Sequence, residues 1–191
     1  MKVVAFNGSP RKNGNTMYLI KKVLEPVEES GINTEIIQVG GRNIHGCRAC
    51  FRCFDNKDNM CSVKDDIFNE CLEKMIEADA IIIGSPTYFA NVTAEIKALI
   101  DRAGLVAIAN SGLLENKIGA AVTAERRAGG LTVIEAIYRM FLVTKMIIPC
   151  STYWNFGIGL EEGEVASDTE GINNMIDLGK RIAWLLQKIR S

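Results

Sequence analysis

The sequence predicts an α/β fold, a doubly wound parallel sheet of five strands in the order 2-1-3-4-5 with helices on both of its faces. Short runs rich in Val and Ile alternate five times with longer segments of helical periodicity, as in consecutive βα units. A barrel would need eight such units and about 250 residues, whereas the chain has 191 residues. A cysteine-rich loop interrupts the pattern after the second strand.

Composition and charge describe one ordinary globular domain, which we expect to span residues 1–191. Apolar residues make up 48% and charged residues 24% of the chain, which excludes a disordered protein. The 22 Lys and Arg residues are balanced by 23 Asp and Glu residues, so we expect no nucleic-acid partner. No apolar run reaches the ~18 residues of a membrane span or resembles a signal peptide. We therefore expect a cytoplasmic protein without a membrane anchor, in which cysteines stay reduced.

The five predicted strands are short runs of β-branched and other apolar residues that end at polar or turn-forming residues. They are expected at Lys2–Asn7, Thr34–Val39, Asp79–Gly84, Lys117–Thr123 and Met146–Thr152. The third run, Asp-Ala-Ile-Ile-Ile-Gly, does not alternate between polar and apolar residues, so it is predicted to be buried on both faces. Asn7 and Gly8 end the first strand in a turn.

Five helices are predicted between and after these strands, because apolar residues recur there at helical spacing. They are expected at Asn15–Ser30, Asp65–Glu77, Thr93–Ile108, Leu131–Thr144 and Ile172–Ile189. Gly31 is a suitable cap for the first helix, and the last helix carries a one-sided apolar stripe from Ile172 to Leu186. Right-handed crossovers place such helices on both faces of the sheet.

Ligands bind to sheets of this kind at the carboxyl ends of the strands, so the loops after strands one, three and four are the candidate site. In the first loop, Ser9, Asn13, Asn15 and Thr16 offer short polar side chains where a helix begins. Free N–H groups and the partial positive charge of a helix N-terminus favour an anion such as phosphate. Arg11 would add countercharge. The alternative is an ordinary polar turn with a good helix cap.

The first loop lacks two known phosphate-binding patterns. The dinucleotide fingerprint G-x-G-x-x-G is absent. The Walker loop needs Lys before Ser or Thr, and this chain has Asn15 before Thr16. The loop is therefore poorly suited to phosphoryl transfer.

The second loop places aromatic side chains at the same edge of the sheet. Pro86 fixes a turn after the third strand, and Tyr88 and Phe89 follow it. Aromatic residues there suit an apolar, planar ligand such as a flavin ring, or else they staple the loop to the next helix. The third loop, residues 124–130, contains two Arg and two Gly residues. It is either a polar wall of the site or a solvated charged loop.

Four of the six cysteines lie within fifteen residues, at Cys47, Cys50, Cys53 and Cys61. Three cysteines at intervals of three residues, with a fourth after a short loop, are typical of iron–sulfur clusters. Zinc tetrathiolates usually consist of two separated C-x2-C pairs, and a reducing compartment argues against disulfides. The spacing favours a [4Fe–4S] cluster in a loop of about residues 45–64, with a zinc site and a metal-free redox thiol cluster as alternatives.

The other residues around this loop have simpler predicted roles. Cys71 in a helix and Cys150 in a strand are expected to be small buried side chains. Arg48 and Arg52 lie inside the loop and would temper the negative charge of a cluster. His45, the only histidine, is expected to be a plain loop residue.

The loop motifs and the cysteine spacing together resemble a known family. Gly-Ser-Pro-Arg-Lys-x-Gly-Asn-Thr at 8–16 and Gly-Ser-Pro-Thr-Tyr-Phe-Ala-Asn-Val-Thr-Ala-Glu-Ile-Lys-Ala-Leu-Ile-Asp-Arg at 84–102 resemble the NAD(P)H-dependent FMN reductase branch of the flavodoxin-like proteins. The compact Cys47–Cys61 motif narrows the resemblance to the iron–sulfur flavoproteins of anaerobic archaea and bacteria. The resemblance covers nearly the whole chain.

The resemblance implies cofactor-binding residues in all three loops and four cluster ligands. The first loop would hold the FMN phosphate with Ser9, Arg11, Asn13, Asn15 and Thr16. The second loop would line the isoalloxazine with Pro86, Thr87, Tyr88, Phe89 and Asn91. The third loop would approach the pyrimidine side of the ring with Ala124, Glu125, Arg126 and Gly129. One [4Fe–4S] cluster would be ligated by Cys47, Cys50, Cys53 and Cys61.

Three functions are compatible with these observations. The first is an iron–sulfur flavoprotein, an oxidoreductase that passes electrons between FMN and a [4Fe–4S] cluster and couples a ferredoxin-like or NAD(P)H donor to a small-molecule acceptor. The second is a cluster-free NAD(P)H-dependent FMN or quinone reductase, and the third is a non-enzymatic binding module with structural zinc. The cysteine spacing favours the first. The resemblance further implies a homodimer or homotetramer in which the cluster of one subunit lies near the flavin of another.

Overall fold

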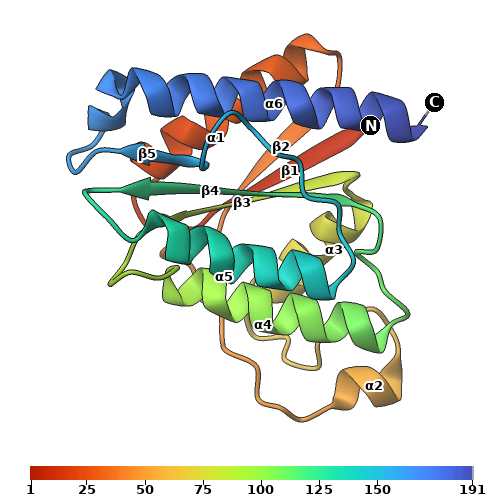
Figure 1. Ribbon diagram of the computed structural model, residues 1–191. Coiled ribbons are helices and arrows are strands. Elements are labelled where there is room, and N and C mark those ends of the chain that lie inside the picture. Colours follow the sequence, from red (N-terminus) through yellow and green to blue (C-terminus); the bar gives the residue numbers. More distant parts are fainter. Residues whose placement is uncertain (191) are drawn as a thin grey trace.

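The fold is a five-stranded parallel sheet between two layers of helices, in a computed structural model that describes residues 1–190 (Figure 1). The strands lie in the order β2-β1-β3-β4-β5, and every pairing is parallel. Their bounds are β1 Lys2–Asn7, β2 Asn33–Gln38, β3 Ala80–Pro86, β4 Ile118–Glu125 and β5 Phe156–Ile158. The predicted fold class and strand order are confirmed.

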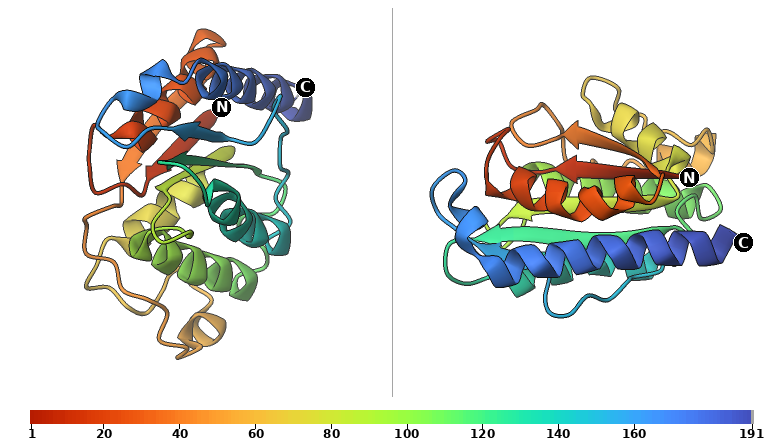
Figure 2. Two further views of the ribbon diagram at one scale, coloured as in Figure 1. Left: turned by 60° about the vertical axis from the view of Figure 1, so that its left-hand side comes forward. Right: turned by 90° about the horizontal axis from the view of Figure 1, so that it is seen from above.

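The helices divide between the two faces of the sheet, as two further views also show (Figure 2). Their bounds are α1 Asn15–Glu29, α2 Arg52–Asn56, α3 Phe68–Glu77, α4 Ala94–Ala109, α5 Gly130–Val143, the 3-10 helix η1 Glu164–Ser167, and α6 Thr169–Arg190. Helices α1 and α6 cover one face, and α3, α4 and α5 cover the other. The two short elements, α2 and η1, were not predicted, because four or five residues are too few to show helical periodicity.

Alternate residues of each strand supply two separate hydrophobic cores. Val3 and Ala5 of β1 pack with α1 and α6, whereas Val4 and Phe6 pack with α3, α4 and α5. The isoleucines of β3 at positions 81–83 contribute to both cores, so β3 is buried on both faces as predicted. The central strands therefore form a rigid base from which the loops at their carboxyl ends project.

The fifth strand lies later in the chain than predicted. Within the expected segment Met146–Thr152, only Ile147 pairs with the sheet, through a single bridge to Ile118. Pro149 follows, and proline has no N–H to donate to a strand ladder. The chain leaves the sheet there and returns at Phe156, which pairs with Thr123. Cys150 consequently lies in an exposed loop, and its predicted burial in a strand was wrong.

The loops after β1, β2 and β3 meet closely at the carboxyl edge of the sheet. The N–H of Gly8 donates to the carbonyl of Gly84 at 2.7 Å, which joins the first and third strands beyond their ladder. The chain after β2 crosses directly over this turn, because a Cβ on Gly40 would lie 2.3 Å from the carbonyl carbon of Ser9. Only glycine permits this approach of one backbone to another.

The cysteine loop, residues 45–64, lies outside the helical layer and against α4 (Figures 1 and 2). The segment that leads from β2 into the cysteine loop contacts the first turn of α4, where the N–H of Gly41 donates to Glu95 Oε1 at 3.0 Å. The loop reaches the other end of the same helix, where the N–H of Asn59 donates to Asn110 Oδ1 at 3.0 Å. Helix α4 is thus the support on which the loop rests.

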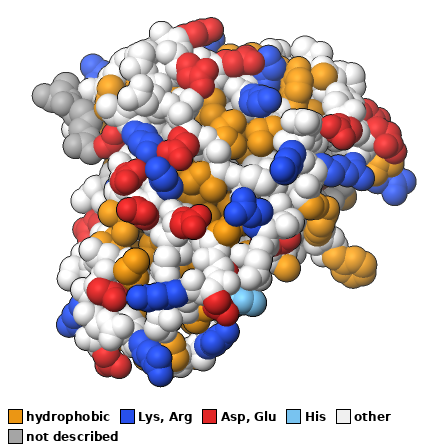
Figure 3. All heavy atoms as spheres, turned by 180° about the vertical axis from the view of Figure 1, so that it is seen from behind, with side chains coloured by type: hydrophobic (Ala, Val, Ile, Leu, Met, Phe, Trp, Pro, Cys, Tyr) orange, Lys and Arg blue, Asp and Glu red, His pale blue; other side chains and the backbone are white. Residues whose placement is uncertain are grey.

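The surface carries charges of both signs. Figure 3 shows Lys and Arg side chains intermingled with Asp and Glu across one face of the molecule. None of the helices within residues 1–190 is both long and apolar enough to cross a lipid bilayer.

Candidate functional site

The first loop and the start of α1 form an anion-binding geometry. Helix α1 begins after Gly14, which offers no side-chain cap, so its first N–H groups are open to a ligand. Thr16 is 1% exposed, and its buried hydroxyl has no hydrogen-bond partner within residues 1–190. Ser9 is also buried, and its Oγ accepts the N–H of Arg11 at 3.2 Å. A buried hydroxyl without a partner at a helix N-terminus is poised for an acceptor from outside the chain.

A cleft of about 140 Å³ opens above this helix N-terminus, and we call it the strand-end cleft. Its lining comes from the loops after β1, β3, β4 and β5: Ser9, Arg11, Asn15, Thr16, Pro86, Thr87, Tyr88, Ala124, Arg126, Gly159 and Leu160. Nine of these residues belong to the cofactor-binding set predicted from the sequence. The structure therefore brings members of all three predicted loops together at one place.

The other five predicted residues, Asn13, Phe89, Asn91, Glu125 and Gly129, do not line the strand-end cleft. Phe89 stands fully exposed at the tip of a tight turn in which Tyr88 and Asn91 exchange backbone hydrogen bonds at 2.9 and 3.0 Å. Both residues at the tip of this turn have left-handed backbones, with φ of 49° at Phe89 and 59° at Ala90. Such a conformation costs free energy for residues other than glycine, and it is found preferentially at ligand-binding loops.

Glu125 and Gly129 shape the third loop from behind the cleft. Glu125 is buried, and its Oε2 accepts the N–H of Gly130 at 2.6 Å at the start of α5. Gly129 has φ of 99°, and a Cβ there would lie 2.9 Å from Thr87 Cγ2 and 3.1 Å from Ala90 Cα. The carboxylate caps a helix, and the glycine lets the second and third loops touch.

Sequence reasoning missed the wall of the cleft that follows β5. Gly159 and Leu160 line it, and the Leu160 carbonyl accepts from Arg11 Nη1 at 3.3 Å. Asn15 Nδ2 donates to the Glu161 carbonyl at 2.9 Å, which ties the same segment to α1. Misplacing the fifth strand hid this wall, although glycines at 157, 159 and 163 indicate a close turn there.

The four clustered cysteines line a second cavity, which we call the cysteine cavity. Its lining comes from the cysteine loop and from α4: Cys47, Arg48, Cys50, Phe51, Cys53, Cys61, Ser62, Val63, Arg102, Leu105 and Val106. The cavity measures about 20 Å³, room for about one water molecule. Its only potential metal-binding side chains are thiols, a donor set that suits iron–sulfur or zinc chemistry.

The backbone of the cysteine loop turns sharply at several residues other than glycine. Ala49, Phe51, Lys57 and Asn59 all have φ between 49° and 60°. At one of these turns the N–H of Ala49 donates to Cys47 Sγ, with 3.5 Å between nitrogen and sulfur. Left-handed turns that aim backbone N–H groups inward create sites for anions such as thiolates.

The thiols differ in acidity because their surroundings differ. The Ser62 hydroxyl, 3.4 Å from Cys50 Sγ, and the backbone N–H of Arg52 lower the pKa of the exposed Cys50 thiol. Burial raises the pKa of Cys53, and nearby Cys61 and Cys50 add to that effect. Cys71 is buried as predicted, and burial raises the pKa of its thiol to about 12.

Within residues 1–190, no three His, Cys, Asp or Glu side chains converge closely enough to hold a single metal ion. His45 is part-exposed and faces Asp65, with 3.8 Å between Nε2 and Oδ2. It does not line the cysteine cavity, in keeping with its predicted role as a loop residue.

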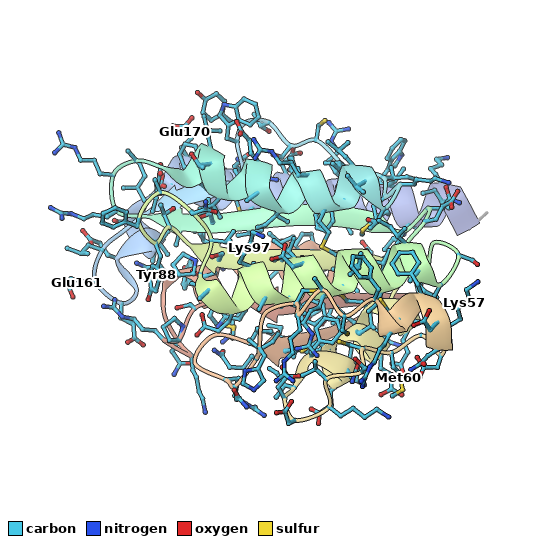
Figure 4. All side chains as sticks on the ribbon, turned by 90° about the horizontal axis from the view of Figure 1, so that it is seen from below. Lys57, Met60, Tyr88, Lys97, Glu161 and Glu170 are labelled. Carbon is cyan, nitrogen blue, oxygen red and sulfur yellow. The ribbon has the colours of Figure 1, made fainter. Side chains whose placement is uncertain are left out.

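The two candidate sites lie far apart on the chain's surface. Figure 4 shows Tyr88 and Glu161 at one end of the molecule and Lys57 and Met60 of the cysteine loop at the other. Thr93 caps α4 beside the strand-end cleft, and Val106 on the same helix lines the cysteine cavity. The α4 residues that line the cavity, Arg102 to Val106, are nine to thirteen residues along the helix from Thr93, which corresponds to about 14–20 Å.

The chain is similar to known proteins along its whole length. Residues 1–161 match the family described as NADPH-dependent FMN reductase. The chain is 37% identical over 197 residues to an iron–sulfur flavoprotein of Methanocaldococcus jannaschii, covering all of both chains. It is 32% identical over 192 residues to an iron–sulfur flavoprotein of Methanosarcina thermophila, covering 100% of this chain and 97% of that protein.

Solved structures show the same fold. RosB, crystallised with 8-demethyl-8-formylriboflavin-5'-phosphate, superposes with a TM-score of 0.75 at 18% identity, covering 100% of this chain and 80% of that one. A flavodoxin from the domain Archaea superposes with a TM-score of 0.61 at 18% identity, covering 98% and 99%. The chain therefore has the flavodoxin-like fold, and it belongs to the NADPH-dependent FMN reductase family and, within it, to the iron–sulfur flavoproteins, which are flavin-dependent oxidoreductases.

Proposed function

We propose that this protein binds FMN in the strand-end cleft and a [4Fe–4S] cluster on its four clustered cysteines, and that it carries electrons between them. The observation that carries the proposal is the presence of both sites on one chain. An open helix N-terminus with an unpartnered buried hydroxyl lies under one cavity, and four thiols line the other. The names of the similar proteins, which are iron–sulfur flavoproteins, support the same assignment.

The strand-end cleft fits a phosphate and a planar ring. The Thr16 hydroxyl, the Ser9 side chain and the first N–H groups of α1 would hold the phosphate, with Arg11 as countercharge. Thr87 and Tyr88 after β3, with Ala124 and Arg126 at the end of β4, line the cleft where the isoalloxazine would lie. Asn13, Phe89, Asn91, Glu125 and Gly129 support or border these loops rather than lining the cleft.

The cysteine loop fits a cluster because it supplies four thiols, two of which are exposed. Asn69 on α3 holds Cys61 by accepting its N–H at 2.8 Å and donating to its carbonyl at 3.0 Å. Cys53 is buried against α4, whereas Cys47 and Cys50 are exposed. Because the cavity is smaller than a cluster, we expect these two exposed cysteines to move outward on binding while Cys53 and Cys61 stay in place.

When both groups are bound, FMN exchanges electrons singly or in pairs and the cluster exchanges them singly, which joins one-electron to two-electron chemistry. The chain supplies binding, orientation and charge, and we assign no side chain as a general acid or base. A ferredoxin-like protein or NAD(P)H would be the donor and a small molecule the acceptor. Tyr88 and Arg126, at the open side of the cleft, would meet that small molecule.

The separation of the two sites along α4 favours an oligomer, because one chain does not bring them into contact. In a homodimer or homotetramer, the cluster of one subunit would lie near the flavin of another. Exposed apolar side chains at the β5 edge, Tyr153 and Trp154, and Trp184 of α6 are candidates for burial between subunits. The recess of about 350 Å³ beside them is lined by Tyr138 and residues 148–155.

The test is cofactor content after purification without oxygen. We expect flavin absorption together with about four irons and matching acid-labile sulfide per chain. Cys50→Ala should abolish the cluster absorption and leave FMN bound, whereas the matched control Cys150→Ala, an exposed cysteine outside the loop, should change neither. Unchanged iron content in the Cys50 variant would refute the ligand assignment.

A cluster-free NAD(P)H-dependent FMN or quinone reductase is the second candidate. The match to the FMN reductase family over residues 1–161 favours it, because that description names no cluster. Rapid NAD(P)H oxidation by protein that contains FMN but no iron would establish this function. Zinc at one ion per chain, with no flavin, would instead establish a structural metal site.

A further inference from the structure

We propose that Arg102 of α4 is a positioning residue for the iron–sulfur cluster: it ties the two ends of the cysteine loop together and offers its Nε–H to sulfur in the cysteine cavity. The inference rests on the proposed function, since it presupposes a cluster on the four cysteines. Arg102 lines the cysteine cavity, together with Leu105 and Val106 from the same helix. No other arginine of the cavity lining is buried.

The guanidinium group closes the base of the cysteine loop. Arg102 Nη1 donates to the carbonyl of His45 at 3.1 Å, two residues before Cys47. Its Nη2 donates to the carbonyl of Val63 at 3.0 Å, two residues after Cys61. One side chain therefore binds the backbone on both sides of the cysteine run, which fixes the span that the four thiols must bridge.

Asp66 completes this anchor. Its carboxylate forms a fully buried ion pair with Arg102 Nη1. The same carboxylate accepts the N–H of His45 at 2.7 Å and that of Phe68 at 3.1 Å. The Arg102 guanidinium also lies 3.9 Å from the centre of the Phe68 ring. These contacts fix the orientation of the Arg102 guanidinium through Nη1, Nη2 and its planar face.

The Nε–H of Arg102 is the exception. It is buried, and it has no hydrogen-bond partner within the described residues. A buried donor of this kind carries a desolvation cost, so an acceptor supplied by a ligand would be favoured. The polar groups that share the cavity with Arg102 are chiefly the cysteine sulfurs. A thiolate or a cluster sulfide is a negatively charged acceptor that a guanidinium N–H matches.

Arg102 differs from the two arginines inside the cysteine loop because its charge is buried. Arg48 and Arg52 are exposed, so water screens their charge. Arg102 is 1% exposed and acts at low dielectric. An N–H donated to cluster sulfur stabilises the more negative, reduced state and so raises the reduction potential. We therefore expect Arg102 to govern both cluster retention and cluster potential.

The experiment uses the full-length protein purified without oxygen, with the variant Arg102→Lys. Lysine keeps the positive charge and loses both the planar fork and the Nε–H. We expect FMN content and the unfolding transition to persist, iron loss to a chelator to become ~10-fold or more faster, and the cluster midpoint potential measured by EPR titration to become more negative. The control Arg139→Lys, an exposed arginine paired with Glu135 on α5, should match the parent protein.

A second variant keeps the inference testable if lysine is not accommodated. Arg102→Gln combined with Asp66→Asn removes both members of the buried pair and leaves no unpaired buried charge. It should bind FMN and show the same changes in iron loss and potential. If iron loss and potential equal those of the parent in both variants, the inference is overturned.

The remaining outcomes separate the inference from the proposed function. Loss of FMN and of cooperative unfolding in both variants would assign Arg102 to the fold and overturn the inference. A parent protein that holds FMN but no iron would overturn the proposed function and the inference together. A parent protein with four irons, and variants that differ from it as expected, would support both.

Discussion

Two side-chain atoms stand out at the scale of single residues, because each is a buried polar atom without a partner among the described residues. They are Thr16 Oγ1 and Arg102 Nε. Buried polar atoms are paired in the great majority of cases, so an exception calls for a physical reason. One of these atoms lies at the strand-end cleft and the other at the cysteine cavity. In both places a ligand would supply the missing partner.

Thr16→Val tests the first of these atoms. Valine keeps the shape of threonine and removes the unpartnered hydroxyl, so the apoprotein should be at least as stable as the parent. FMN binding should weaken by roughly 10–100-fold, because a hydrogen bond to a charged group contributes about 1.5–3 kcal/mol. Fluorescence titration of the apoprotein with FMN measures this change. Thr152→Val, at an exposed position, is the control, and equal affinities in the two variants would contradict the assignment.

Asp66 makes the stability of the cysteine loop depend on pH. Burial alone would raise its pKa, but the hydrogen bonds from Arg102, His45 and Phe68 outweigh that effect and hold the pKa below its usual value. A group whose pKa is lowered on folding stabilises the protein above its unfolded pKa of about 3.9, and that contribution is lost as the pH falls through the folded pKa. Thermal unfolding of the parent should therefore weaken below about pH 4.

Asp66→Asn removes this dependence and breaks the buried pair. Loss of one partner should cost about 3–5 kcal/mol at neutral pH, which corresponds to a fall in Tm on the order of 10 °C. The variant should lose less further stability on acidification than the parent does. Asp101→Asn, whose partner Lys97 is also exposed, should change Tm little. A neutral-pH Tm equal to that of the parent would show that the pair contributes nothing.

At the scale of elements, α4 connects the two candidate sites. Its N-terminal cap Thr93 accepts the N–H of Ile96 and donates its own hydroxyl to the carbonyl of Gly8 at 3.1 Å in the first loop. At the start of its second half, Arg102 holds the cysteine loop. The loops at the strand-end cleft pack backbone against backbone. The closest of these contacts is between Gly40 and Ser9.

Gly40→Ala should therefore damage the strand-end cleft selectively. The added Cβ would lie 2.3 Å from the Ser9 carbonyl carbon and 2.4 Å from the Gly8 oxygen, so the first loop must shift. Overpacking of this kind costs about 1–3 kcal/mol, and we expect the purified variant to retain less FMN than iron. Gly104→Ala on α4 is the matched control.

The control has space for its methyl group, because the nearest side-chain atom, Met140 Cγ, is 3.9 Å away. Replacing glycine by alanine inside a helix should add about 0.5–1 kcal/mol of stability. Cofactor content and Tm, measured together, distinguish the two variants. Full FMN retention by Gly40→Ala would show that the first loop is not part of the phosphate site.

At the scale of the whole molecule, the strand-end cleft and the cysteine cavity lie at different ends of one chain (Figure 4). In the proposed oligomer, electron transfer between the two cofactors would depend on a second subunit. This predicts that two defective chains complement one another. Ser9→Asp places a carboxylate against the FMN phosphate, and Cys50→Ala removes a cluster ligand.

Co-expression with two different tags yields the mixed oligomer of these chains. Its flavin should be reduced by a one-electron donor at a rate close to that of the parent, whereas neither homo-oligomer should show this reaction. Stopped-flow absorbance of the flavin measures the rate. The electron route would lie within one chain if the mixed oligomer were as inactive as the two variant homo-oligomers. The same conclusion would follow if light scattering showed the unmodified protein to be a monomer.

The fold class and the strand order could be predicted from the sequence and are confirmed, and nine of the cofactor-binding residues that the family resemblance implied line the strand-end cleft. Local patterns carry that information, since the buried run of β3 and the polar turn before α1 are read within a few residues. The cysteine spacing likewise singled out the loop that holds Cys47 to Cys61. These features depend on neighbouring residues in the sequence, and contacts with distant segments do not change them.

Features that join distant segments could not be predicted from the sequence and follow only from the packed fold. The fifth strand begins at Phe156, after Pro149 has interrupted the predicted strand. The segment that follows it, with Gly159 and Leu160, forms a wall of the strand-end cleft. Arg102 lies in the helix predicted at Thr93–Ile108, and only packing brings its side chain to carbonyls 57 and 39 residues away in the sequence. Hydrogen bonds and burial between remote residues leave no periodic trace in a sequence, which is why the support of the cysteine loop emerges only from the fold.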